Sequence, residues 1–531
     1  MLTRDGIKLD ADIYRPDAEG EFPVLLMRQP YGRAIASTVV YAHPTWYAAQ
    51  GYIVVIQDVR GRGTSEGEFR LFSNETADGA DSINWVASLP GSTGKVGMYG
   101  FSYQAMTQLY AATTKPAALK TICPAMMAYD LYADWAYEGG AFCLQTNLGW
   151  AIQLSAETAR LQGDTAAYQT LYKASRSLPS HPEPDLMECL RKFAPNAFYH
   201  QWLEHSKPDS YWEKLSPKGA MQVDLPMLHI GGWFDTYLRG NIRLYKDIAG
   251  RSGYRQQLLI GPWTHLPWCR KVGAVDFGNE AINPIDKLQI RWFDQFLKEI
   301  DTGLLDEAPI CLFEMGSNFW RKFNTFPNNN HQAYFLSSNG LASIREDDGI
   351  LITNKPKSCT DDILVHDPWR PVPTLGGHAA IPAGCFERSH LDYRSDVLTY
   401  TTKPLAALHI AGEIVVEIWC NSDKPSHDLC AVLSEVHPDG KAYNLTQGYL
   451  HVETSQNDVA LQILLQATCA KITQGNALRL SISAACFPAY ALNFGTGKSE
   501  ANLIDAEIIT LSVSCGGNRA SRMLLPVVSL T

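Results

Sequence analysis

The chain has 531 residues, of which 46% are hydrophobic and 19% are charged, with a formal net charge of −10. This length predicts two or three domains, and the composition is typical of a folded protein with a sizeable core. An acidic balance without a basic run argues against nucleic acid or an anionic membrane as a partner.

The 12 cysteines are scattered and form no C-x-x-C pair, so we expect neither a metal nor a cofactor. Apolar runs are too short to cross a membrane, and a strand pattern over Ile7–Ile13 begins directly after the N-terminus without a signal peptide. These features predict a cytoplasmic protein with reduced thiols, unless an export signal has been trimmed. A homo-oligomer is compatible with the sequence.

The first part of the chain, residues 1–123, alternates strand and helix patterns. Apolar runs at Val24–Met27 and Tyr52–Ile56 are typical of central strands in a parallel sheet. Residues 80–86 predict a crossover helix, and residues 119–123 predict the next strand. This alternation indicates an α/β fold.

A serine stands at a predicted sharp turn in this part. The apolar run Val96–Tyr99 is followed by a glycine, then Ser102, then a helical pattern over Ala105–Ala112. Such an elbow lifts a hydroxyl above the sheet, where a base can reach it, and predicts acyl transfer through a serine ester. Gln104 departs from the pattern because a small residue is usual there, and a buried structural serine is the alternative.

Residues 124–224 leave the α/β pattern and are rich in Ala, Tyr, Trp and Leu at helical spacing. We expect a helical insertion that caps the active site. Residues 225–303 then resume the sheet and end in a helix over Leu288–Ile300. That helix is expected to turn four apolar side chains towards the core: Trp292, Phe293, Phe296 and Leu297.

Two further polar residues follow predicted strands in the resumed sheet. Asp235 stands just past an apolar run that ends in glycines, and His265 ends a similar run about 30 residues later. Together with Ser102 they follow the chain order Ser, Asp, His and predict a triad, with His265 as base and Asp235 orienting the imidazole. Taken singly, Asp235 is more simply explained as a helix cap and His265 as a loop histidine.

The last part, residues 304–531, shows short alternating strands separated by Gly, Asn, Asp and Pro turns. Leu408–Trp419 and Leu478–Ser483 are two examples. This pattern predicts an all-β sandwich.

Together these motifs resemble the cocaine-esterase-like hydrolases, a family that includes X-Pro dipeptidyl peptidases, α-amino-acid ester hydrolases and some β-lactam acylases. The resemblance extends over nearly the whole chain, and its blocks are Met27–Gly32, Gln57–Gly67, Gly100–Tyr103, Gly232–Asp235 and Gly261–His265. It implies an α/β-hydrolase domain with a helical cap insertion, plus a C-terminal jelly-roll sandwich. Ala105 replaces the family's usual glycine.

The resemblance also implies an oxyanion hole made by the Tyr31 hydroxyl and the backbone N–H of Tyr103. A tetrahedral oxyanion needs donors already aimed at it. From the residues alone, Tyr31 would be read as an aromatic side chain in the turn after Pro30.

The family's acyl pocket lies between the cap and the loop with the triad acid. The matching wall residues, each of which could equally be ordinary core, are Trp135, Tyr137, Phe142, Phe234 and Tyr237. The α-amino-acid ester hydrolases bind an ammonium through carboxylates, some just past the triad Asp, where this chain has none. Asp134 and Glu138 remain candidates for that role, although a solvated helix face is the commoner explanation of such acids.

We therefore expect a serine hydrolase that cleaves small-molecule esters or amides with an apolar or aromatic acyl group. An X-Pro dipeptidyl peptidase acting on short peptides, an α-amino-acid ester hydrolase and an acyltransferase are alternatives with the same chemistry. A binding protein with an idle triad is a more distant alternative.

Overall fold

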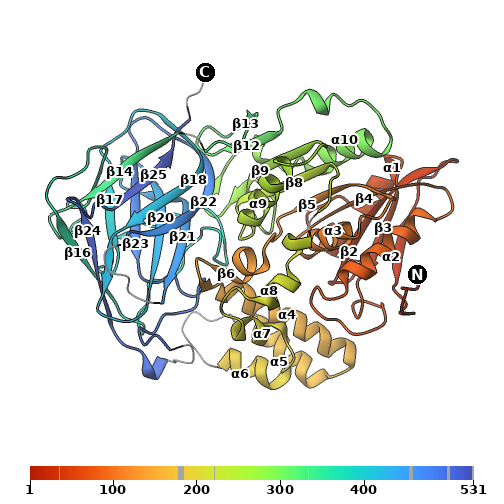
Figure 1. The fold of residues 1–531 in the computed structure, drawn as a ribbon, viewed down its shortest axis with the longest axis horizontal. Helices are drawn as coiled ribbons and strands as arrows, with labels where there is room; N and C mark the ends of the chain where they lie inside the picture. Colours follow the sequence, from red (N-terminus) through yellow and green to blue (C-terminus); the bar gives the residue numbers. More distant parts are fainter. Residues whose placement is uncertain are drawn as a thin grey trace.

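The computed structural model describes residues 1–34, 36–176, 185–220, 222–328, 330–453, 459–498 and 503–528. It consists of an N-terminal α/β domain and a C-terminal β-rich domain that lie side by side, with a group of helices along one edge of the α/β part (Figure 1).

The α/β domain is built on a nine-stranded sheet in the order β1-β3-β2-β4-β5-β8-β9-β12-β13. Pairing is parallel from β3 to β12, and the two outermost strands, β1 and β13, pair antiparallel. The strand bounds are Ala11–Tyr14 (β1), Phe22–Gln29 (β2), Ile53–Asp58 (β3), Ser92–Phe101 (β4), Leu119–Ala125 (β5), Met227–Phe234 (β8), Gln256–Thr264 (β9), Ile310–Glu314 (β12) and Phe319–Phe323 (β13).

Both faces of this sheet are covered, which explains the continuous apolar runs of its strands. Val24 and Leu26 of β2 pack in one apolar cluster, whereas the alternate residues Leu25 and Met27 pack in another. Helices α2 (Glu75–Ala87) and α3 (Tyr103–Thr113) contribute to the first cluster, together with part of α9 (Leu238–Ala249). Helices α1 (Pro44–Ala49) and α10 (Ile285–Leu297) contribute to the second.

The segment between β5 and β8 is mainly helical, as predicted from its composition. Its elements are a short π-helical turn (Tyr132–Ala136), a small hairpin of β6 (Tyr137–Glu138) and β7 (Ala141–Phe142), and the helices α4 (Leu144–Gln162), α5 (Thr165–Ser175), α6 (Asp185–Phe193), α7 (Phe198–Glu204) and α8 (Ser210–Leu215). In the part of the chain that the structure describes, no helix has the length and apolar character needed to span a membrane.

The C-terminal part contains a nine-stranded sheet and a three-stranded sheet. The larger sheet has the order β21-β20-β23-β17-β15-β14-β25-β18-β22, and the smaller has the order β16-β24-β19. The bounds are β14 His331–Ser337, β15 Ile350–Ile352, β16 Thr360–His366, β17 Leu398–Thr401, β18 Leu408–Ile418, β19 Cys420–Ser422, β20 His427–Val436, β21 Ala442–Val452, β22 Leu461–Ile472, β23 Ala477–Ser483, β24 Ile509–Cys515 and β25 Arg522–Pro526.

The sheet boundaries differ from the prediction in two places. β12 and β13 belong to the N-terminal sheet, because β12 is paired parallel with β9 and is largely buried. The N-terminal sheet therefore continues past residue 303. In the sequence, β12, the tight turn after it and β13 look like a hairpin of the β-sandwich, which explains the predicted boundary at residue 303. At the N-terminus the strand is shorter than Ile7–Ile13, because residues 1–9 fold back on themselves through the Leu2–Lys8 bridge.

The two domains share a core. Trp233 and Phe234 at the end of β8 lie in one continuous apolar cluster with residues of the C-terminal sheets, including Leu465 of β22. The end of β8 is therefore supported from the C-terminal domain.

Candidate active site

The candidate nucleophile lies between β4 and α3. Ser102 has φ 58° and ψ −127°, a left-handed backbone conformation that is strained for a serine. The turn is tight because Gly100 has φ 139°, and a Cβ there would lie 2.5 Å from the Cβ of Gln104. The Ser102 N–H donates to the carbonyl of Ala125 at 2.9 Å, which fixes the turn against β5.

The unusual Gln104 takes part in this turn. Its side-chain Oε1 accepts a hydrogen bond from the backbone N–H of Phe101 at 3.2 Å. A long amide at this position therefore satisfies a backbone donor inside the elbow, which accounts for the departure from a small residue.

Asp235 and His265 follow the neighbouring strands β8 and β9, so their side chains meet at the same edge of the sheet. The imidazole Nδ1 of His265 lies 2.8 Å from Oδ1 of Asp235. The carboxylate is fully buried, whereas the imidazole is 28% exposed. Because Nδ1 is engaged by the carboxylate, Nε2 is the nitrogen left for proton transfer.

Aromatic groups hold the imidazole ring. The ring of Tyr237 meets it edge-on with centroids 5.0 Å apart, and the ring of Phe101 lies 5.5 Å away. The indole of Trp268 donates to the backbone carbonyl of His265 at 3.1 Å. These contacts limit the motion of the candidate base.

Tyr31, two residues beyond the end of β2, has its hydroxyl beside the candidate nucleophile. Burial raises the pKa of Tyr31 to about 12, against the lowering effect of hydrogen bonds with Trp150 and Ser102. The Trp150 indole donates to the Tyr31 hydroxyl at 3.1 Å. A phenol with this pKa stays protonated at neutral pH and keeps its proton available for donation.

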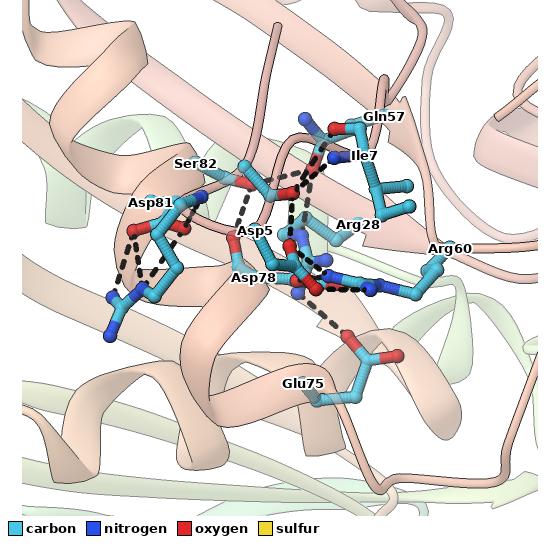
Figure 2. Close-up of polar contacts among 11 residues, drawn as sticks. Asp5, Ile7, Arg28, Gln57, Arg60, Glu75, Asp78, Asp81 and Ser82 are labelled. Atoms are coloured by element: carbon cyan, nitrogen blue, oxygen red, sulfur yellow. Dashed lines mark hydrogen bonds and ion pairs between the residues drawn. The ribbon is translucent and has the colours of Figure 1, made fainter. Parts of the chain in front are cut away.

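Tyr103 opens α3, so its N–H has no acceptor within the helix. Its own hydroxyl donates to Oε1 of Glu75 at 2.8 Å. Arg28 of β2 donates to the other Glu75 oxygen at 2.7 Å and to Gln57 at 2.8 Å, and Figure 2 shows these contacts. Glu75, the first residue of α2, therefore connects the strand that leads to Tyr31 with the tyrosine that opens α3.

The predicted wall residues separate into three groups. Trp135 packs on Tyr237 with ring centroids 4.3 Å apart, so both lie beside the imidazole. Tyr137 and Phe142 pack on each other with centroids 5.2 Å apart in the β6–β7 hairpin. Phe234 lies instead in the core shared with the C-terminal sheets.

Sequence reasoning missed Trp150, which contacts both Trp135 and the Tyr31 hydroxyl. It lies in the middle of α4, where nothing in the local pattern distinguishes it from a core tryptophan.

The expectation that Asp134 and Glu138 form a solvated helix face is wrong, because both are buried. Asp134 Oδ1 pairs with Arg243 at 2.6 Å.

Glu138 Oε2 accepts hydrogen bonds from three donors at 2.6–2.8 Å: Arg239, His378 and the Tyr490 hydroxyl. These donors come from α9 and from the C-terminal part, so Glu138 joins three regions of the chain. At Glu138, burial acts to raise the pKa, but the charges of Arg239 and His378 outweigh it and lower the pKa to about 2.

Among the described residues, no group of three or more His, Cys, Asp or Glu side chains is arranged to hold a metal ion.

Comparison with known proteins identifies the family. A model described as X-Pro dipeptidyl-peptidase (S15 family) matches residues 5–267, and one described as X-Pro dipeptidyl-peptidase C-terminal non-catalytic domain matches residues 302–523. The chain belongs to the S15 family. This S15 chain is 29% identical to cocaine esterase of Rhodococcus sp., covering 99% of this chain and 97% of the relative.

Other relatives agree with this assignment. A putative serine esterase of Mycobacterium bovis is 24% identical, covering 85% of this chain and 79% of the relative. The fold is similar to that of an α-amino acid ester hydrolase, with a TM-score of 0.81 at 22% identity over 99% of this chain and 95% of that one. It is also similar to that of an aminopeptidase from a marine sediment archaeon, with a TM-score of 0.82 at 22% identity over 99% of this chain and 95% of that one. The S15 chain is a serine hydrolase.

The Glu138 cluster predicts a pH-dependent contribution to stability. Because the folded pKa is lowered from 4.5 to about 2, the ionised carboxylate stabilises the fold above pH 4.5, and this contribution is lost as the pH falls towards 2. The difference in unfolding free energy between wild type and Glu138→Gln should therefore shrink over that range. Urea unfolding at a series of pH values measures it.

The matched control is Glu453→Gln, because the Glu453 carboxylate is 55% exposed. A wild-type advantage over Glu138→Gln that stays constant down to the lowest pH would contradict the assigned ion pair.

Proposed function

We propose that the enzyme hydrolyses carboxylic esters or amides through an acyl-enzyme on Ser102. His265 takes the hydroxyl proton as Ser102 Oγ attacks the substrate carbonyl, and the proton then goes to the leaving group as the ester or amide bond breaks. Water, deprotonated by the same imidazole, then attacks the acyl-serine, and the imidazolium returns that proton to Ser102 Oγ as the acyl–oxygen bond breaks and the acid is released. The contact of Asp235 with Nδ1 of His265 is the observation that carries this proposal.

We propose that the oxyanion is bound by the Tyr31 hydroxyl and the Tyr103 N–H. Two observations support this pair. The Tyr31 phenol stays protonated and lies near enough to Ser102 for that side chain to lower its pKa, and the Tyr103 N–H stands at a helix N-terminus directly after the nucleophile. Such donors favour the transition state because negative charge develops where they already point.

We further propose that residues 124–224 form a cap over the acyl pocket and that the C-terminal sheets form a jelly roll. Trp135 and Trp150 from this segment pack with centroids 4.9 Å apart, and Trp135 also packs on Tyr237 beside the imidazole. An aromatic wall of this kind favours an apolar or aromatic acyl group.

The ion pairing of the acidic residues in the proposed cap argues for an acyl group without a free amine. An ammonium needs a carboxylate whose charge is available, but Asp134 and Glu138 are each paired with an arginine. This arrangement disfavours two alternatives that need such an anchor, an X-Pro dipeptidyl peptidase and an α-amino-acid ester hydrolase. The relative named cocaine esterase is likewise named for an ester substrate. Acyl transfer to another acceptor would use the same acyl-enzyme.

Two p-nitrophenyl esters test this function, phenylacetyl without an amine and phenylglycyl with one. We expect kcat/KM for phenylacetyl to equal or exceed that for phenylglycyl, because the two candidate anchors for the amine, Asp134 and Glu138, are already paired with arginines. Ser102→Ala serves as the blank and should abolish turnover of both. A strong preference for phenylglycyl would overturn the assigned acyl class, and activity retained by Ser102→Ala would overturn the nucleophile.

Tyr31→Phe tests the oxyanion hole. Loss of one donor aimed at the oxyanion should lower kcat by roughly 10²–10³-fold with little change in KM, because the bond acts in the transition state. Steady-state kinetics with the phenylacetyl ester measures this.

Tyr52→Phe is the matched control, since Tyr52 directly precedes β3 and its hydroxyl donates to Asp294 at 2.6 Å. If Tyr31→Phe lost stability but kept its kcat, Tyr31 would be a structural turn residue and not an oxyanion donor.

A further inference from the structure

A glutamine of the C-terminal domain reaches the loop that carries the candidate acid. Gln466 lies in β22 and is 2% exposed. Its Nε2 donates two hydrogen bonds, to the backbone carbonyls of Trp233 and Asp235, each at 3.0 Å. One side chain therefore binds the backbone on both sides of Phe234, at the point where β8 ends.

These two carbonyls lie where the regular ladder stops. The pairing of β8 with β9 shifts register between Gly232 and Phe234, so the backbone leaves the repeating hydrogen-bond pattern just before the acid. The Asp235 N–H turns back to the carbonyl of Gly232 at 3.1 Å. Buried carbonyls in such a segment need partners from outside the strand, and Gln466 supplies one for each.

Gln466 is itself held in place. The Thr446 hydroxyl of β21 donates to the Gln466 carbonyl at 2.5 Å, which fixes its backbone in the sheet. On the other side, the indole of Trp233 donates to the carbonyl of Phe313 in β12 at 2.7 Å. The acid loop is thus fastened between the end of the α/β sheet and the C-terminal sheet.

We propose that Gln466 is a positioning residue that sets the backbone of the acid loop so that the Asp235 carboxylate meets Nδ1 of His265. The C-terminal domain, whose family model is described as non-catalytic, therefore contributes a side chain on which the catalytic geometry depends. Gln466 acts on the triad through these two carbonyls. This inference rests on the proposed function, since it needs Asp235 to be the triad acid.

Gln466→Met tests the role, because methionine fills a similar volume without a donor. We expect kcat on p-nitrophenyl phenylacetate to fall by about 10²-fold and KM to change by less than about twofold. A fall of about 10²-fold in kcat is the effect expected when a catalytic group is displaced by about 1 Å. A structural contact that served only to join the domains would lower the melting temperature and leave kcat unchanged.

Two control variants separate these roles. Gln462→Met changes an exposed glutamine on the same strand and should leave both kcat and melting temperature unchanged. Glu413→Gln removes the 2.8 Å ion pair between Glu413 and Lys246. This ion pair joins the same two domains but lies outside the acid loop. It should leave kcat unchanged whatever it does to the melting temperature.

A folded Gln466→Met enzyme with wild-type kcat would overturn the inference while leaving the proposed function intact. If Gln466→Met does not fold, Gln466→Asn keeps the amide on a side chain too short to reach both carbonyls, and the same loss of kcat is expected. If wild type does not turn over the ester, or Ser102→Ala retains turnover, the proposed function fails and this inference fails with it.

Discussion

The arrangement of the candidate active site depends on a fully buried carboxylate. Asp235 has no exposed surface, and a buried charge is tolerated only when it is paired and hydrogen bonded. Its partner is Nδ1 of His265, so β8 and β9 must bring both residues to the same edge of the sheet within one hydrogen-bond length. The strained turn at Ser102 and the shared core behind Trp233 are consistent with a site in which small displacements matter.

The elements that carry the candidate triad could be predicted from the sequence because each follows a local rule. An apolar run that ends in glycine marks a central parallel strand, and the polar residue just beyond it lies at the carboxyl edge of the sheet. The structure places Ser102, Asp235 and His265 directly after β4, β8 and β9. Their positions follow from strand patterns alone.

What the sequence did not reveal depends on contacts between distant parts of the chain. Glu138 looked like a solvated acid because its partners, Arg239 and Tyr490, lie about 100 and 350 residues away. Trp150 and Gln466 look like ordinary helix and strand residues, and only the tertiary fold brings them to Tyr31 and to the acid loop. Local periodicity gives the element and its buried face, but it does not give the partner across a domain boundary.

A crystal structure with phenylboronic acid, which mimics the tetrahedral intermediate, tests the central claim most directly. The account predicts a covalent bond from boron to Ser102 Oγ, with one boron-bound oxygen within hydrogen-bond distance of the Tyr31 hydroxyl and the Tyr103 N–H. The phenyl ring should lie against Trp135 and Tyr237. A boron bonded to another residue, or an adduct on Ser102 whose oxygens reach neither tyrosine, would contradict the account.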